Sequence, residues 1–159
     1  MRALLAALLL SAPAPAMAAG WNHYTNVRFG YAIDVPPGFV GRGEAANGDG
    51  QVFRTPTATL TVFGGNIIAG NFEGEVVQRE RDAEQDKWAI TYQVSTPTHA
   101  SYSGKHGARV LYGRMVALCK GRQYAMFELQ YSSVDIATFN PIIDRLVASL
   151  QPMEGSASC

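Results

Sequence analysis

The sequence predicts an α+β fold, in which an antiparallel β-sheet of about six to seven strands is sandwiched between a mid-chain helix and a C-terminal amphipathic helix. Two observations predict it. Short segments in both halves of the chain alternate apolar with polar residues, and turns rich in glycine and proline separate them. Two other segments, one charged (73–86) and one apolar (141–150), instead have the residue spacing of amphipathic helices.

The first 18 residues have the features of a secretory signal peptide. A basic residue, Arg2, precedes an apolar run over residues 3–10, and the segment ends on the small-residue triplet Ala-Met-Ala at 16–18. Two prolines before this triplet argue against a buried N-terminal helix. The apolar run is far shorter than the ~20 residues that span a bilayer. We therefore expect cleavage near Ala18 and a soluble periplasmic or secreted product without a membrane span.

The rest of the chain is expected to form a single domain over residues 19–150, followed by a polar C-terminal tail over 151–159. Neither an internal repeat nor a long linker divides it. The chain carries 13 basic and 13 acidic residues without a basic cluster, so its charge pattern indicates no nucleic-acid partner.

The first half of the domain is expected to form two hairpins and one helix. Pro36 and Pro37 end the first hairpin because proline cannot donate to a strand ladder. A flexible, glycine-rich loop follows over 41–50, and Asn71 is placed to cap the helix, whose narrow apolar stripe predicts a position on the surface. In order, the expected elements are strands at 23–25, 31–35, 51–54 and 58–63, and a helix at about 73–86.

The second half is expected to form four strands and the closing helix. Bulky side chains alternate on both faces of the strand 122–131, so this strand should be central and covered on both sides. The alternating apolar residues from Trp88 to Val94 should share one face of their strand. Asn140 should cap the closing helix, with Pro141 in its first turn. The expected strands are 88–94, 99–103, 108–118 and 122–131.

The chain contains two cysteines, Cys119 and Cys159. In an oxidising compartment a disulfide between them is the natural interpretation. The alternative is that Cys159, at the chain end, remains free while Cys119 packs as a small apolar side chain.

Tyr24, Asn26 and the segment Ala-Ile-Asp-Val-Pro-Pro-Gly-Phe at 32–39 open the expected domain, and an apolar alternation at 127–131 precedes its closing helix. This arrangement resembles the PsbP-like fold family, which includes bacterial exported proteins of the DcrB type. The resemblance implies an antiparallel sheet between helices and a role as a binding or assembly factor. It implies neither a photosynthetic role nor a set of metal ligands in this chain.

The sequence predicts no catalytic residue, metal ligand or cofactor site. His23, His99 and His106 lack the paired spacing of metal ligands and are expected to be surface or structural residues. The segment 101–106 contains serines, a lysine and a histidine but matches no nucleophile motif. The carboxylates of the helix 73–86 alternate with basic residues, which is typical of a solvated face with i, i+4 pairs.

Aromatic residues beside arginines are the most distinctive feature of the expected domain. A subset of them could form a docking surface, because aromatic residues and arginine are enriched at the centres of interfaces. The residues that we select for this surface are Trp21, Tyr24, Arg28, Tyr112 and Arg114.

These features favour an exported, non-catalytic binding or accessory protein of the cell envelope, whose partner is an envelope protein or a small ligand. An inhibitor of an envelope-targeting hydrolase is the alternative, and it needs a rigid protruding loop such as 41–50 or 104–107. An enzyme with dispersed catalytic residues is the third hypothesis. It would require a cleft that holds a carboxylate or histidine of strongly shifted pKa.

Overall fold

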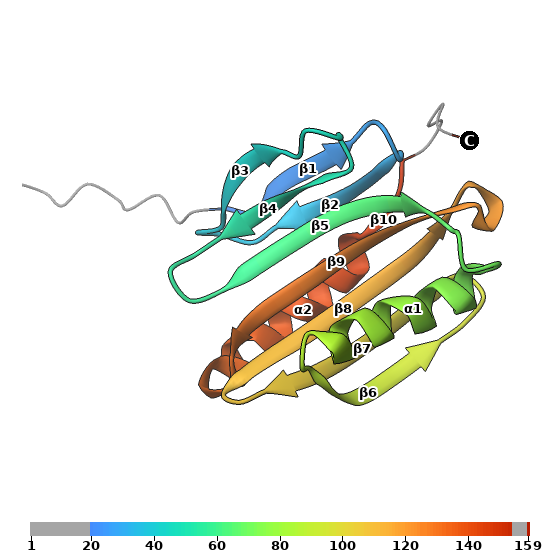
Figure 1. Ribbon diagram of the computed structural model, residues 1–159. Helices are drawn as coiled ribbons and strands as arrows, with labels where there is room; N and C mark the ends of the chain where they lie inside the picture. Colours follow the sequence, from blue (N-terminus) through green and yellow to red (C-terminus); the bar gives the residue numbers. More distant parts are fainter. Residues whose placement is uncertain (1–19, 154–158) are drawn as a thin grey trace, which may run out of the picture.

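The computed structural model describes residues 20–153 and residue 159. The expected signal peptide and residues 154–158 of the expected tail lie outside this part of the chain. Seven strands form one antiparallel sheet in the order β3-β4-β5-β9-β8-β7-β6 (Figure 1). Its strands are β3 (Val40–Glu44), β4 (Gly50–Arg54), β5 (Thr59–Asn66), β6 (Ala89–Ser95), β7 (His99–His106), β8 (Arg109–Leu118) and β9 (Gln123–Ser132).

A second, three-stranded sheet has the order β1-β2-β10, with β1 at Asn22–Asn26, β2 at Tyr31–Val35 and β10 at Gln151–Pro152. Both pairings to β2 are antiparallel. The expected polar tail therefore begins as a short strand.

The two helices lie on opposite faces of the seven-stranded sheet (Figure 1). One face packs against α1 (Phe72–Gln85), and the other packs against α2 (Ile136–Ser149) together with β2. We call them the α1 face and the α2 face. Each face has its own apolar core, and the expected α+β fold with a sheet between two helices is confirmed.

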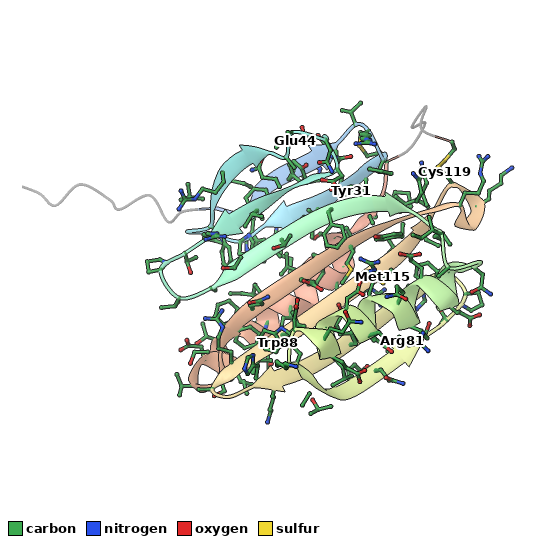
Figure 2. The ribbon with its side chains drawn as sticks, viewed as in Figure 1. Tyr31, Glu44, Arg81, Trp88, Met115 and Cys119 are labelled. Atoms are coloured by element: carbon green, nitrogen blue, oxygen red, sulfur yellow. A yellow bond between two sulfur atoms is a disulfide. The ribbon has the colours of Figure 1, made fainter. Side chains whose placement is uncertain are left out.

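The strand β9 lies in the middle of the sheet, and its alternate residues feed the two cores. Ala125, Phe127 and Leu129 belong to the core under α2, whereas Tyr124 and Met126 belong to the core under α1. The expectation that this strand is central and covered on both sides is confirmed. Met115 and Trp88, labelled in Figure 2, also belong to the core under α1.

Four elements differ clearly from those expected. The strand β5 continues to Asn66, whereas its expected end was residue 63. Most of the edge strand β3 lies in the loop expected at 41–50. Its glycines interrupt the apolar alternation that would have predicted a strand, so its pairing with β4 could not be predicted from the sequence. The strand β7 continues to His106 and includes residues expected in a turn. The helix α2 begins at Ile136, with Pro141 inside it and Asp135 at its N-cap, because Phe139 stacks on the Tyr131 ring with 4.4 Å between the centroids and extends the packed helix.

No helix in the described part of the chain is long and apolar enough to cross a membrane.

Candidate functional site

Neither face of the seven-stranded sheet is fully covered. The core under α1 draws its buried sheet residues from β7, β8 and β9, which leaves β3, β4 and most of β5 open on that face. The core under α2 instead draws on β4, β5, β9 and part of β8, and on the strand β2, which leaves the β6 side of the α2 face open. The two open areas therefore lie at opposite ends of the sheet, on opposite faces.

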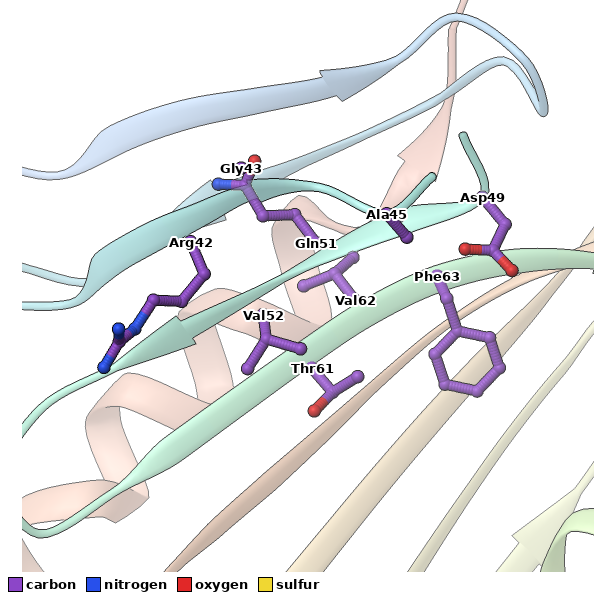
Figure 3. Close-up of a pocket in the computed structure, with 10 residues that line it drawn as sticks. Arg42, Gly43, Ala45, Asp49, Gln51, Val52, Thr61, Val62 and Phe63 are labelled. Carbon is purple, nitrogen blue, oxygen red and sulfur yellow. The ribbon is translucent and has the colours of Figure 1, made fainter. Parts of the chain in front are cut away.

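The open area of the α1 face is a groove of about 300 Å³ over β3, β4 and β5. Figure 3 shows Val52, Thr61 and Phe63 along it, with Arg42 at one end and Asp49 at the other. The groove is mainly apolar between these two charges.

A narrower cleft of about 200 Å³ lies between α1 and the sheet, and the Phe63 side chain lines both it and the groove. The half-buried Glu128 of β9 lies in this cleft and accepts a hydrogen bond of 2.8 Å from the Tyr102 hydroxyl. Burial raises the pKa of the Glu128 carboxyl, and the nearby carboxylates of Asp86 and Asp82 raise it further. A carboxyl of this kind could exchange a proton or bind a cationic group.

Gly113 makes the contact between Tyr102 and Glu128 possible. Gly113 pairs with Tyr102 on one side and with Glu128 on the other, so the tyrosine must cross β8 to reach the carboxyl. A Cβ atom at residue 113 would lie 2.6 Å from the Tyr102 ring, which is too close. A glycine within a strand thus marks the close approach of a side chain.

The sequence predicts that Glu75 of α1 lies on a solvated face of the helix. The structure shows that it is buried instead. Its side chain is 1% exposed. It accepts backbone hydrogen bonds from Ile68 (3.1 Å) and Ala69 (3.3 Å) and lies 3.4 Å from the Arg79 guanidinium. The segment before α1 folds back over the helix and buries this carboxylate, which the i, i+4 charge pattern could not reveal.

The open area of the α2 face is a trough between β6 and β8, which we call the β6–β8 trough. Tyr92 and Val94 of β6 form one wall, Tyr112 and Arg114 of β8 form the other, and the small side chains of Ser101 and Ser103 on β7 form the floor. In register, Tyr92 pairs with Ser103 and Ser103 with Tyr112, while Val94 pairs with Ser101 and Ser101 with Arg114. A cavity of about 550 Å³ continues from Tyr92 and Tyr112 to Ile136 and Asp144 of α2.

A β-bulge creates the outer wall of this trough. The pairing of β6 with β7 shifts between Ile90 and Tyr92, so Tyr92 and Val94 face away from α1 although Trp88 and Ile90 pack under it. The expectation that these four residues share one face is therefore wrong. The bulge leaves Tyr92 52% and Val94 46% exposed, which is the re-aiming of side chains that bulges produce.

Arg114 is half-buried in the inner wall of the trough. Its Nη1 donates to the Ser101 hydroxyl at 3.2 Å, and its buried Nε has no hydrogen-bond partner among the described residues. Burial lowers the pKa of the guanidinium, while the Tyr112 and Tyr92 phenols act in the opposite direction.

The five residues selected from the sequence as a docking surface do not form one surface. Tyr112 and Arg114 share the trough. Trp21 lies under the Arg145 guanidinium, 4.3 Å from its carbon. Tyr24 packs edge-on against Phe53 of β4, and Arg28 donates to the Asn47 carbonyl oxygen. The sequence missed Tyr92, which the bulge exposes.

The three histidines lie apart. The His23 ring hydrogen-bonds Asp34 at 3.1 Å, the His99 ring lies 3.3 Å from the Thr98 hydroxyl, and His106 packs edge-on against Trp88. No group of three metal-ligating side chains occurs within residues 20–153 and 159.

A disulfide joins Cys119 to Cys159, with 4.9 Å between the Cα atoms. Cys119, labelled in Figure 2, begins the connection from β8 to β9. Arg122 of the same connection donates to the Cys159 carbonyl oxygen at 2.7 Å.

The architecture is that of a PsbP-like α+β domain, as the sequence predicts, and solved structures share it. One is the solution structure of cyanobacterial PsbP (CyanoP) from Synechocystis sp. PCC 6803, which is 16% identical, with a TM-score of 0.63 over 90% of this chain and 98% of that chain. Another is the Ran-binding protein Mog1p of Saccharomyces cerevisiae, 12% identical, with a TM-score of 0.62 over 87% and 98% of the two chains. No protein-family model and no curated protein matches the sequence.

Proposed function

We propose that this chain is an exported, non-catalytic binding or accessory protein of the cell envelope that docks another protein on the β6–β8 trough. The observation that carries this proposal is the exposed Tyr92 and Val94 beside the half-buried Tyr112 and Arg114. Exposed aromatic residues around an arginine are typical of the centres of protein interfaces.

Two further observations support the proposal. A structural neighbour with the same fold is a Ran-binding protein, so this architecture can serve protein recognition. The signal-peptide features of residues 1–18 and the Cys119–Cys159 disulfide both fit an oxidising compartment outside the cytoplasm.

Site-specific photo-crosslinking in the source organism tests the docking site. A benzophenone amino acid at Tyr92 should crosslink to one discrete envelope protein. The same probe at Val77, which is exposed on α1 and so on the other side of the sheet, is the matched control. Equal crosslinking from both positions, or none from Tyr92, would contradict the proposed site.

Cell fractionation and intact mass test export separately. The protein should be recovered from the periplasm or the medium with a mass that corresponds to cleavage near Ala18. A full-length chain in the cytoplasm would contradict this part of the proposal.

The connection from β3 to β4 favours an inhibitor of an envelope-targeting hydrolase as the second candidate. Asn26 donates to the Gly48 carbonyl oxygen at 2.9 Å, Gly48 N–H donates to Ala45 at 2.8 Å, and the Asn47 amide donates to Asp49 at 2.6 Å. These bonds fix an exposed loop, as a protein inhibitor requires. Inhibition of lysozymes or envelope proteases by the purified protein, lost in Asn26→Ala, would support this candidate.

The raised pKa of Glu128 favours the third candidate, an enzyme with dispersed catalytic residues. A screen of ester, amide and glycoside substrates should compare the protein with Glu128→Gln, which keeps the shape of the cleft. An activity that this substitution abolishes would support the enzyme, and a screen without turnover would contradict it.

A further inference from the structure

Arg114 lacks the carboxylate partner that its burial calls for. The other half-buried arginine of the sheet faces, Arg79, lies 3.2 Å from Asp82 and 3.4 Å from Glu75. Arg114 has no such ion pair with any described residue, and its one hydrogen bond is to the Ser101 hydroxyl. The buried Nε of both arginines lacks a hydrogen-bond partner among the described residues, but carboxylates balance the charge of Arg79 and none balances that of Arg114.

An uncompensated guanidinium in this position is costly. Removing a charge from water is unfavourable unless an opposite charge or a full set of hydrogen bonds replaces the lost hydration. The lowered pKa of Arg114 reflects this cost, because burial is its largest cause and only phenols oppose it. A carboxylate that entered the trough would recover the lost electrostatic stabilisation without any change in the fold.

The acidic residues of this chain leave almost no internal partner for Arg114. Of its 13 acidic residues, all except Glu154 lie in the described part of the chain, and none of those pairs with Arg114. A carboxylate that paired with Arg114 would therefore come from Glu154 or from another molecule.

We propose that the β6–β8 trough binds a side-chain carboxylate of the partner protein, with Arg114 as its ion-pair partner and Tyr92 and Tyr112 on either side. This inference rests on the docking function proposed above and names the chemistry of the partner. One guanidinium matches the single charge of a carboxylate. A phosphate carries about two charges, and the other cation of the trough, Lys105, shares its cavity with the opposing Asp144.

Nuclear magnetic resonance of the oxidised protein over residues 19–159 tests the site without knowledge of the partner. The probe is glutamate blocked at both ends, so that only its side-chain carboxylate is charged, and the blocked glutamine is the neutral control. Blocked glutamate should shift the Arg114 Nε–Hε resonance saturably, and blocked glutamine should not. No shift, an equal shift with both, or saturation by inorganic phosphate alone would overturn the carboxylate assignment.

Glu154→Gln tests whether this chain fills its own site. If the Arg114 resonance of the free protein is unchanged in this variant, the site is open to a partner. A shift in the absence of ligand would show that Glu154 occupies it, and the inference would be wrong.

Crosslinking from Tyr92 connects this chemistry to the partner. Arg114→Gln should reduce the yield at least about tenfold, because an ion pair at a desolvated position is lost. Arg109→Gln, at the exposed start of the same strand, should not. If Arg114→Gln is unstable, Arg114→Lys takes its place in the experiment. This variant keeps the charge and should crosslink with an intermediate yield. Unchanged crosslinking in Arg114→Gln would reject the ion pair with a carboxylate of the partner but would keep the docking site. If the probe at Tyr92 gives no crosslink in the protein with Arg114 intact, the docking function itself is rejected.

Discussion

Glu75, Glu128 and Arg114 are charged side chains that the fold withdraws from water, and each is compensated differently. Glu75 has two backbone amides and Arg79. Glu128 has a single described hydrogen bond, from Tyr102, and Arg114 has a serine but no carboxylate. At the scale of the residue, compensation therefore distinguishes Glu75, which has both backbone donors and an ion pair, from Glu128 and Arg114, which each have a single described side-chain hydrogen bond.

Replacing Glu75 should destabilise the protein strongly. Glu75→Leu leaves two backbone N–H groups without acceptors and removes a partner of Arg79, so the free energy of unfolding should fall by about 2–4 kcal/mol. Urea unfolding measures it. Glu73→Leu, at an exposed position of the same helix, is the control and should change stability by less than about 0.5 kcal/mol. Equal effects would contradict the buried role of Glu75.

Replacing Glu128 should give a stability gain that depends on pH. Because the pKa of Glu128 is raised in the folded protein, its contribution to stability is fully present below the ordinary glutamate pKa of about 4.3 and is lost as the pH rises through the folded value. Glu128→Gln removes this loss and keeps an acceptor for Tyr102. The variant should therefore gain stability over the unmodified protein at pH 7 and lose that advantage at pH 3.5.

Urea unfolding at the two pH values measures the Glu128→Gln effect. An advantage of Glu128→Gln that is larger at pH 3.5 than at pH 7 would contradict the sign of the pKa shift.

The ends and irregularities of the elements decide which side chains meet. The bulge in β6 divides one apolar alternation between two faces and so makes the wall of the trough. The helix α1 ends in a Schellman motif, in which Trp88 N–H donates to Ala83 and Lys87 N–H donates to Glu84, both at 3.0 Å. This motif directs Trp88 into the core under α1.

Lys87 occupies the position in this motif where glycine is preferred, with a φ of 71°. Lys87→Gly should stabilise the protein by about 0.5–1 kcal/mol, because a side chain strains the left-handed conformation. Gln85→Gly, inside the last turn of α1, should instead destabilise it by about 1 kcal/mol. Thermal and urea unfolding of both variants measure the difference. Destabilisation by Lys87→Gly would show that the lysine side chain makes a compensating contact.

At the scale of the whole molecule, two features involve several elements at once. They are the partly covered faces of the sheet and the disulfide. The last residue, Cys159, is tied to the connection between the neighbouring strands β8 and β9. The short strand β10, which precedes it in the sequence, pairs with β2 of the smaller sheet. The C-terminal segment is thus anchored to both sheets.

Removing the disulfide should lower stability substantially. It spans 40 residues, and closing such a loop restricts the unfolded chain by about 4 kcal/mol on the chain-entropy model. Urea unfolding of Cys119→Ser/Cys159→Ser should show a loss that approaches this value. The unmodified protein should lose the same amount under reducing conditions, whereas the double variant should not respond to reductant. Equal unfolding curves for all samples would contradict a structural role.

The sequence by itself determined the fold class, the hairpins, the central place of β9 and the existence of both helices, because each follows from the spacing of apolar residues along a continuous segment. Tertiary contacts decided the rest. β3 forms because β4 is beside it, and α2 begins early because Phe139 meets Tyr131. Tyr112 and Arg114 were selected from composition, but only strand register places them beside Tyr92 and away from the described carboxylates. Periodicity is local and can be read along the chain, whereas the compensation of a buried charge depends on residues brought together from distant segments.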